Sequence, residues 1–232
     1  MNYFIPTVKI PGLISTETII YGFSQRFHET SEEEKTGLKL RVLNETKAGL
    51  EGKKFFLKSS NASDNAIYFL KQIHSDRIYV LNDPSMKTQE VCNIRADAIV
   101  THLVNKPIGI FSADCIPVIV HDPLQNVIGA IHAGRRGTGS QILQKTVKLL
   151  KSLYKSESSD LRIGLGPGIG PCCYEVGEDC LGLFRKNYKK WEKFIRAGKS
   201  GKFFLDLFKA NCEDALNSGL LDKNIFVSGH CT

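Results

Sequence analysis

Residues 96–133 decide the fold of this chain and read ADAIVTHLVNKPIGIFSADCIPVIVHDPLQNVIGAIHA. The stretch holds four short apolar runs bounded by Asp, Pro, Asn or Gly: Ala98–Val100, Ile108–Phe111, Pro117–Val120 and Val127–Ile131. Runs of this length are typical of strands buried on both faces. The segment 122–126 between the last two runs is short enough for a hairpin, so part of the sheet is expected to be antiparallel.

Helices and further strands are predicted on both sides of this stretch. Apolar residues recur at helical spacing over 140–153, with Ser140 as the expected N-cap, and a second helix over 206–218 is expected to stop at Gly219. Strands are expected at 78–81, 161–165, 172–176 and 224–227, and residues 29–65 are expected to form surface helix and loop. Strands and helices do not alternate strictly, which favours an α+β fold over a doubly wound sheet.

The composition is that of an ordinary globular protein. The 232 residues include 31 Lys and Arg and 24 Asp and Glu, a net charge of +7, with 42% apolar and 24% charged residues. This excludes a disordered tail, a collagen-like rod and a pure coiled coil. No apolar run approaches the ~18 residues that span a membrane, and residues 1–9 contain no apolar secretory core. A cytoplasmic protein without a membrane partner is therefore expected.

The positive charge is spread along the chain. Residues 186–202 interleave basic and aromatic side chains, as nucleic-acid grooves do, but we interpret them as a solvated helix whose apolar residues face the core. No nucleic-acid partner is expected. The charge favours small anionic substrates such as phosphate or nucleotides.

The seven cysteines do not form a recognisable scaffold. Their number is odd and no CxxC pair occurs, so neither a disulfide framework nor a zinc site of four cysteines is expected. Most are interpreted as small buried hydrophobes. Alternation along the strand expected at 172–176 would aim Cys172 and Cys173 at opposite faces, and both are interpreted as structural.

Three potential ligands stand at or near the ends of predicted strands: His74, Cys115 and His132. Two imidazoles and one thiolate suit zinc and leave a fourth position for water or substrate. The spacings of 41 and 17 residues match no short zinc pattern. The same atoms suit a metal-free site, in which Cys115 is a nucleophile, His132 its base, and Asp114 or His74 orients the base.

Several motifs together resemble one known family, once called multicopper polyphenol oxidase or laccase-like proteins. Its members are now described as purine nucleoside phosphorylases with adenosine deaminase activity, and bacterial members also as peptidoglycan editing factor. The resemblance runs from about residue 21 onward and rests on motifs in family order: KQIHS at 71–75, ADA at 96–98, ADCIPV at 113–118, HAGRRGT at 132–138, GPGIGPCCYEVG at 166–177, LDL at 205–207 and CT at 231–232.

The resemblance implies one fold over residues 1–232, with two packed mixed sheets flanked by helices in an α/β/β/α sandwich. It implies a single metal ion, and the family's ligands map onto His74, Cys115 and His132. The implied cofactor is zinc, with copper as the alternative. The implied substrates are purine nucleosides (adenosine, inosine, guanosine and methylthioadenosine), cleaved with phosphate, and adenosine is also deaminated. Zinc-bound hydroxide attacking C6 of adenine is a physical route to deamination.

Neighbouring residues receive roles from the same resemblance. Arg136, in the turn after His132, is expected to bind phosphate through its guanidinium. Gln72 and Asp114 are expected to orient the ligands, and Asp114 is also a candidate acid or base. The sequence gives no signal for an oligomeric state.

The chain departs from the family at three places. Arg135 stands where relatives usually carry Trp, and the family's aromatic and arginine-rich C-terminal segment does not follow Cys231 and Thr232. Residues 29–65 do not align with the family's Asn-Arg-containing helix. Weak or altered activity is expected if those arginines help to bind phosphate.

Other classes of function fit part of the pattern. A copper phenol oxidase would use His and Cys ligands, but laccase chemistry needs many histidines and this chain has six. A metal-free cysteine hydrolase or amidase editing cell-wall precursors would depend on Cys115 and survive chelation. A non-catalytic relative would bind zinc and nucleoside without turnover.

Overall fold

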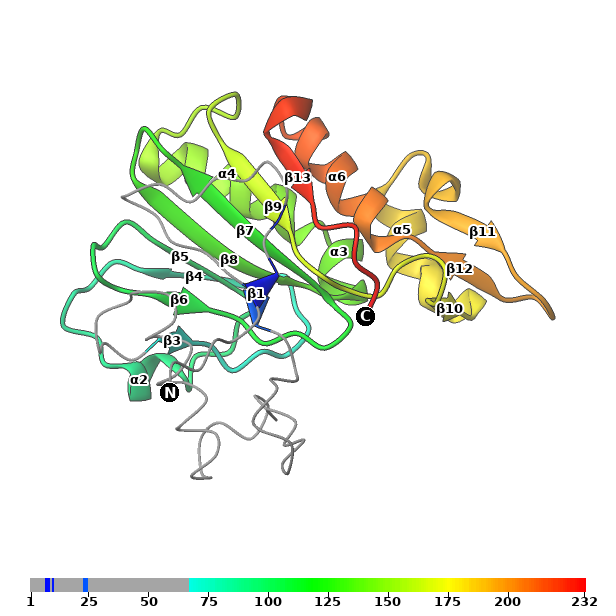
Figure 1. Cartoon of the computed structure of the whole chain (residues 1–232), viewed down its shortest axis with the longest axis horizontal. Coiled ribbons are helices and arrows are strands. Elements are labelled where there is room, and N and C mark those ends of the chain that lie inside the picture. The colour runs from blue at the N-terminus through cyan, green and yellow to red at the C-terminus, as the bar shows by residue number, and fades with distance from the viewer. Residues whose placement is uncertain (1–6, 9, 11–22, 25–66) are drawn as a thin grey trace.

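The structure is a computed structural model that describes residues 7–8, 10, 23–24 and 67–232. The prediction for residues 29–65 lies outside these residues. At the centre of the described part is a six-stranded mixed sheet (Figure 1). Its spatial order is β13 (Ile225–Val227), β9 (Arg162–Leu165), β7 (Ile116–Asp122), β8 (Val127–Ala133), β5 (Ala98–Thr101) and β4 (Ile78–Leu81).

The hairpin of β7 and β8 is the longest pairing in this sheet. It is antiparallel, from Ile116 opposite Ala133 to Asp122 opposite Val127. The Asp122 carboxylate accepts hydrogen bonds from the backbone N–H groups of Leu124 and Gln125 and so closes the turn. Antiparallel pairs join β5 to β8 and β7 to β9, while β4 pairs with β5 and β13 with β9 in parallel. The predicted hairpin is confirmed.

Smaller sheets accompany the central one (Figure 1). Strands β10 (Glu175–Val176), β12 (Phe203–Leu205) and β11 (Ile195–Ala197) form an antiparallel sheet. β3 (Tyr68–Phe69) pairs with β6 (Ile108–Gly109) in parallel, and β1 (Thr7–Val8) with β2 (Phe23–Ser24) in antiparallel fashion. The run predicted over 108–111 therefore forms a strand of only two residues, outside the central sheet.

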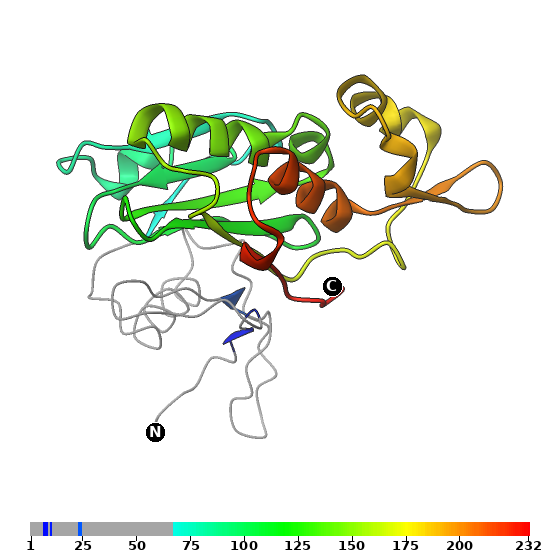
Figure 2. The same ribbon diagram turned by 90° about the horizontal axis from the view of Figure 1, so that it is seen from above.

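Helices α4 (Ile142–Tyr154) and α6 (Leu207–Asn217) lie on one face of the central sheet (Figures 1 and 2). The buried stripe of α4, with Ile142, Val147 and Leu150, shares one core with Val118 of β7 and Ile131 of β8. A second buried cluster includes Ile99 of β5 and Ala130 of β8. Because successive residues of a strand point to opposite faces, these two clusters explain why β5 and β8 are apolar along most of their length.

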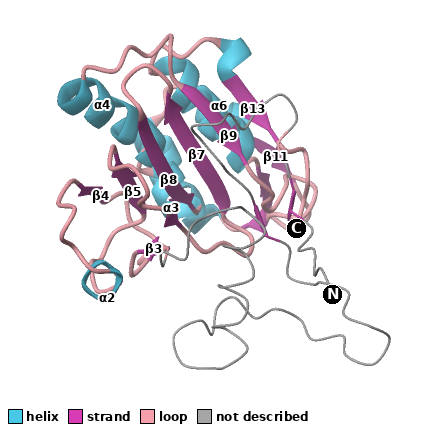
Figure 3. Cartoon of the chain, turned by 60° about the vertical axis from the view of Figure 1, so that its left-hand side comes forward, coloured by secondary structure: helices cyan, strands magenta, loops and turns pink. Residues whose placement is uncertain are grey.

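The remaining helices in the described residues are short. They are α2 (Thr88–Val91), α3 (Arg135–Gly139), α5 (Gly182–Asn187) and the 3-10 turns η2 (Glu178–Leu181), η3 (Trp191–Phe194) and η4 (Asp222–Asn224). α3 and α4 follow β8 directly in the chain and lie beside the sheet (Figure 3). None of the helices in the described residues is long and apolar enough to cross a membrane.

Three local predictions are wrong. Ser140 does not cap α4: its backbone N–H bonds to the carbonyl of Arg136 and ends α3, and Gln141 at φ 60° precedes α4. The strand expected at 172–176 is only Glu175–Val176, because the N–H of Cys173 bonds back to Gly170 in a turn. The expected helix over 186–202 breaks into the end of α5, then η3 and β11, although its Tyr188 and Phe194 are buried as expected.

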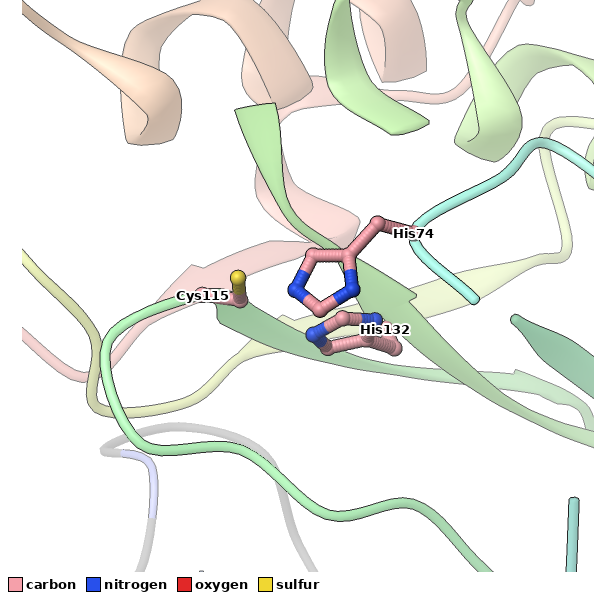
Figure 4. Close-up of side chains that lie close together, drawn as sticks. All are labelled: His74, Cys115 and His132. Atoms are coloured by element: carbon pink, nitrogen blue, oxygen red, sulfur yellow. The ribbon is translucent and has the colours of Figure 1, made fainter. Parts of the chain in front are cut away.

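The fold class is confirmed. Mixed sheets flanked by helices form a single fold, as expected from the irregular alternation of strands and helices. The consequence for function is geometric. The loops before β4 and β7 and the end of β8 open at the same end of the sheet, where the candidate ligands lie (Figure 4).

Candidate metal centre

His74, Cys115 and His132 come from three different segments and converge (Figure 4). Cys115 immediately precedes β7 and His132 is the penultimate residue of β8, so the hairpin register places both at one end. His74 lies in the loop before β4, with a backbone φ of 56°. This conformation is uncommon for a residue with a side chain and turns the loop toward the hairpin.

The three side chains are close enough to share one ion. Their ligand atoms lie within 4.8 Å of one another. The rings of His74 and His132 meet edge to face, with centroids 4.8 Å apart and planes at 84°. His132 is buried whereas His74 is exposed. The group is therefore anchored in the sheet on one side and open to solvent on the other.

Asp97 joins two of the three ligands. This fully buried carboxylate lies 3.0 Å from Nδ1 of His132 and accepts the backbone N–H of His74 at 2.9 Å. Its other oxygen accepts the N–H and hydroxyl of Ser75, both at 2.7 Å, and the N–H of Ile73 at 3.3 Å. One carboxylate thus orients the His132 ring and fixes the loop that carries His74.

These contacts shift the pKa values of both partners. Burial acts to raise the pKa of Asp97, but the hydrogen bonds from His132 and Ser75 outweigh it and lower the value to about 2. Burial acts to lower the pKa of His132, and the contacts with Asp97 and Cys115 outweigh it and raise the value to about 9. In the metal-free protein the imidazole is therefore a cation beside the Asp97 carboxylate, and a metal ion must displace its proton.

Gly134 leaves the space that the ligands occupy. A Cβ atom there would lie 2.7 Å from Sγ of Cys115 and 3.4 Å from Cδ2 of His74. Its φ of −73° is one that any residue adopts, so the requirement for glycine is one of space and not of backbone conformation. A side chain at this position would therefore force the Cys115 thiol or the neighbouring backbone to shift.

Gln72 fastens the two ligand-bearing loops to each other. Its side-chain amide donates to the carbonyl of Phe111 at 2.8 Å and accepts the N–H of the same residue at 2.7 Å. The loop before β4 is thereby tied to the loop that leads to Cys115. The predicted orienting role of Gln72 has a structural basis in this pair of bonds, which act on the loops and not on a ligand directly.

Asp114 points elsewhere. Its carboxylate is exposed and accepts a hydrogen bond from the Thr232 hydroxyl at 3.2 Å, and its carbonyl accepts the N–H of Ile169 at 2.7 Å. The group that orients His132 is Asp97. The expectation that Asp114 orients the base is therefore wrong, because residues adjacent in sequence to a ligand need not face it. The ring of His74, the other residue expected in this role, does meet the His132 ring edge to face.

The two arginines after His132 diverge. Arg136 is exposed on α3, and no hydrogen bond or ion pair joins its side chain to the three ligands among the residues that the structure describes. Arg135 is half-buried and donates to the carbonyl of Cys180 at 3.1 Å. It also lies beside Tyr174. Burial raises the pKa of the Tyr174 hydroxyl, and the nearby Arg135 only partly opposes this rise. Arg135 thus packs against the segment that leads to α5.

Asp97 is the functional residue that sequence reasoning missed. A signal was present, because an aspartate flanked by Ala96 and Ala98 at the start of an apolar strand is predicted to be buried. Buried carboxylates need partners, but the sequence does not say which groups supply them. The partners here lie 22 to 35 residues away.

The donor set fits a metal ion. Two imidazoles and one thiolate, with an exposed side, match sites that keep a coordination position open for substrate. The Asp97–His132 pair is the carboxylate–histidine arrangement that commonly supports ligating imidazoles. The three residues can therefore hold a metal ion. Copper and zinc both accept such ligands.

Comparison with known proteins gives a consistent family. The family model described as multi-copper polyphenol oxidoreductase laccase matches residues 20–232. A protein of Clostridium acetobutylicum named purine nucleoside phosphorylase is 40% identical over 116 residues, which cover 50% of this chain and 47% of the relative. The alignment thus spans about half the length of that relative.

Longer alignments carry related names. A purine nucleoside phosphorylase of Aquifex aeolicus is 34% identical over 166 residues, covering 72% of this chain and 71% of the relative. A protein named adenosine deaminase RL5, from an unknown prokaryotic organism, is 30% identical over 168 residues, covering 70% and 63%. Among solved structures, the Bacillus licheniformis hypothetical protein YfiH aligns with a TM-score of 0.81 at 25% identity, covering 90% of this chain and 81% of that one.

Proposed function

The chain belongs to the multi-copper polyphenol oxidoreductase laccase family, and from this premise we propose that it is a zinc-dependent purine nucleoside phosphorylase that also deaminates adenosine. The observation that carries the proposal is the convergence of His74, Cys115 and His132 with one side exposed. Relatives named for these two activities support the choice of substrate class. The substrates are purine nucleosides and phosphate, both small molecules.

Zinc, when bound by His74, Cys115 and His132, lowers the pKa of a coordinated water and so supplies a nucleophile at neutral pH. The chain's own contribution is position. Asp97 is hydrogen-bonded to Nδ1 of His132, so Nε2 is the ring nitrogen that remains available to bind the metal ion. The same carboxylate fixes the backbone of His74. The His132 ring and the backbone of His74 are therefore held in place before any substrate arrives.

Phosphate needs a cationic partner at the open side. Arg136 lies in α3, four residues after His132, and its exposed guanidinium provides planar, bidentate donors. We assign phosphate binding to Arg136 and leave Arg135 in a packing role, since Arg135 is engaged by Cys180. Substituting Arg136 should then weaken phosphorolysis more than deamination, because deamination consumes no phosphate.

The test combines metal analysis with two assays. Metal content is measured by mass spectrometry on the untagged protein and on C115A, with C92A as the matched control, since Cys92 is not among the three converging ligands and its thiol lies against the carbonyl of Gln89. About one zinc per chain, lost in C115A and kept in C92A, is expected. Adenosine should yield inosine without phosphate, and inosine should yield hypoxanthine only with phosphate. Copper in place of zinc would contradict the metal assignment, and zinc without turnover would indicate a binding protein.

A second candidate is favoured by one observation. Cys115 contacts His132, and His132 contacts Asp97, the nucleophile–base–orienter arrangement of cysteine hydrolases. Such an enzyme, for example an amidase acting on cell-wall precursors, needs no metal. Removing all metal with a chelator separates the two candidates: the phosphorylase and deaminase activities should disappear and return with zinc, whereas a cysteine hydrolase would lose activity only in C115A.

A further inference from the structure

A second group of thiols lies outside the candidate metal centre. Cys172 and Cys173 sit in the turn after Gly170, and Cys231 lies in the segment that follows β13. A parallel bridge between Gly168 and Cys231 brings the two segments together, and Figure 1 shows them side by side. Sγ of Cys172 is 3.4 Å from that of Cys231 and 3.5 Å from that of Cys173. All three sulfur atoms lie within 4.8 Å of one another.

Packing does not account for this arrangement. All three cysteines are exposed, whereas free cysteines in general are among the most buried residues. The cluster is also fastened by backbone bonds: the N–H of Thr232 donates to the carbonyl of Gly168, and the N–H of Cys173 donates to that of Gly170. The N–H of Gly170 donates to Sγ of Cys231 at 3.2 Å, a contact that favours a thiolate. Glycine is suited to position 170, because a Cβ there would lie 3.3 Å from two of the sulfur atoms.

We propose that Cys172, Cys173 and Cys231 form a second metal site, in which three thiolates bind one soft monovalent ion, Cu⁺. A disulfide would join only two of these three cysteines, so disulfide formation does not account for the third sulfur atom in the cluster. Thiolate ligands select soft ions, and structural zinc sites close with four ligands. The described residues place three thiols here and no fourth His, Cys, Asp or Glu within the same radius. Binding releases the thiol protons to solvent.

The thiol site and the candidate metal centre are neighbours through Asp114. The loop residue Ile169 donates its N–H to the carbonyl of Asp114, and the Thr232 hydroxyl donates to its carboxylate. Asp114 is the residue before Cys115. An ion bound in the thiol site would therefore also hold in place the loop that contains Asp114 and Cys115. The proposal itself rests on the thiols and does not depend on the activity proposed above.

The experiment isolates the thiol site by removing the other one. C115A protein is reduced, freed of metal and titrated without oxygen with Cu⁺ from a chromophoric chelator. We expect one Cu⁺ per chain and X-ray absorption showing sulfur-only coordination. C115A/C173S removes one thiol that has no role in the backbone bridge. Its affinity should fall by more than the about 10–100-fold typical of losing an outer-shell partner.

The matched control is C115A/C92S, which removes the thiol of the residue that follows α2 and should bind Cu⁺ as C115A does. Circular dichroism on each variant shows that the fold is kept. Three results would overturn the proposal: equal Cu⁺ affinity in C115A/C173S, zinc retained where Cu⁺ is not, or a Cys172–Cys231 disulfide whose reduced form takes up no Cu⁺. Because C115A lacks the first site, none of these results bears on the phosphorylase assignment.

Discussion

At the scale of single residues, Asp97 determines the geometry of the candidate metal centre. It bonds to His132 and to three successive backbone N–H groups of the His74 loop. In D97N, one oxygen acceptor becomes an amide donor that faces other donors. Zinc affinity is expected to fall about 10–100-fold, as for other supporting groups of metal sites, and competition with a fluorescent zinc chelator measures it.

D122A is the matched control for D97N, because it removes the one oxygen that accepts both hydrogen bonds of Asp122. Asp122 is also buried and also accepts two backbone N–H groups, but it lies at the opposite end of β7 from Cys115. Both variants should unfold more easily, by about 1–3 kcal/mol for lost partners of a buried group. Only D97N should bind zinc less tightly. Equal loss of zinc affinity in both would mean that Asp97 acts through stability alone.

Gly134 gives a second prediction at this scale. In G134A the new Cβ would meet Sγ of Cys115 at 2.7 Å, so the thiol or the backbone of β8 must move. The variant should fold but hold less than half of the wild-type zinc, measured by mass spectrometry after dialysis. G182A is its control, since nothing lies within 4 Å of a Cβ at that position. Full zinc content in G134A would show that the site tolerates a methyl group.

At the scale of elements, the β7–β8 hairpin carries two of the three ligands, and α4 packs its apolar stripe against it. α4 begins and ends on left-handed residues, Gln141 at φ 60° and Lys155 at φ 59°. A left-handed conformation at the end of a helix favours glycine. The two ends of α4 are thus set by backbone geometry and not by a side-chain cap.

K155G is therefore expected to stabilise the protein by about 0.5–1 kcal/mol, because glycine adopts the left-handed conformation without steric cost. Urea unfolding at constant zinc measures the change. K151G provides the contrast on the same exposed face: glycine in the last turn of α4 should destabilise by about 1 kcal/mol. A loss of stability in K155G would show that the Lys155 side chain matters more than its backbone.

At the scale of the whole molecule, a buried polar network joins α3, α5 and α6 behind the ligand-bearing strand. The hydroxyl of Tyr188 lies 2.8 Å from the carbonyl of Thr138 and 2.9 Å from the carboxyl of Asp214. One hydroxyl proton cannot serve both acceptors. A protonated Asp214 resolves the conflict by donating to Tyr188, which then donates to Thr138.

Burial raises the pKa of Asp214 to about 7, against an opposing effect of the Tyr188 hydrogen bond. The folded state thus keeps a proton that the unfolded chain releases near pH 4. Stability from this group is complete below pH 4, falls as the pH rises toward about 7, and is lost above it. The slope is at most about 1.4 kcal/mol per pH unit. His121, whose pKa burial lowers to about 4, gives the opposite trend in both proteins. The expected decline is therefore measured as the difference in unfolding free energy between the wild type and D214N, from urea unfolding at pH 4 to 8.

Local pattern in the sequence determined much of the fold. The apolar runs at 117–120 and 127–131, with the short segment 122–126 between them, predicted the hairpin that the structure contains. Helical spacing predicted α4 and α6, and Gly219 ends α6 at φ 91° as expected for a glycine after a helix. The same reasoning singled out His74, Cys115 and His132, because each lies where a strand meets a loop. Their roles as ligands stay predictions.

Only the tertiary structure decided which groups meet. Asp97 reaches residues 22 to 35 positions away, and Cys172 and Cys231 are 59 positions apart. Periodicity reports whether a side chain is buried, since it depends on a residue's near neighbours in the chain. It does not report which loops share the end of a sheet, because that depends on strand order and register. For this reason the sequence alone was enough to predict the hairpin and the three candidate ligands. The carboxylate that joins His132 to the His74 loop and the second thiol cluster became visible only in the fold.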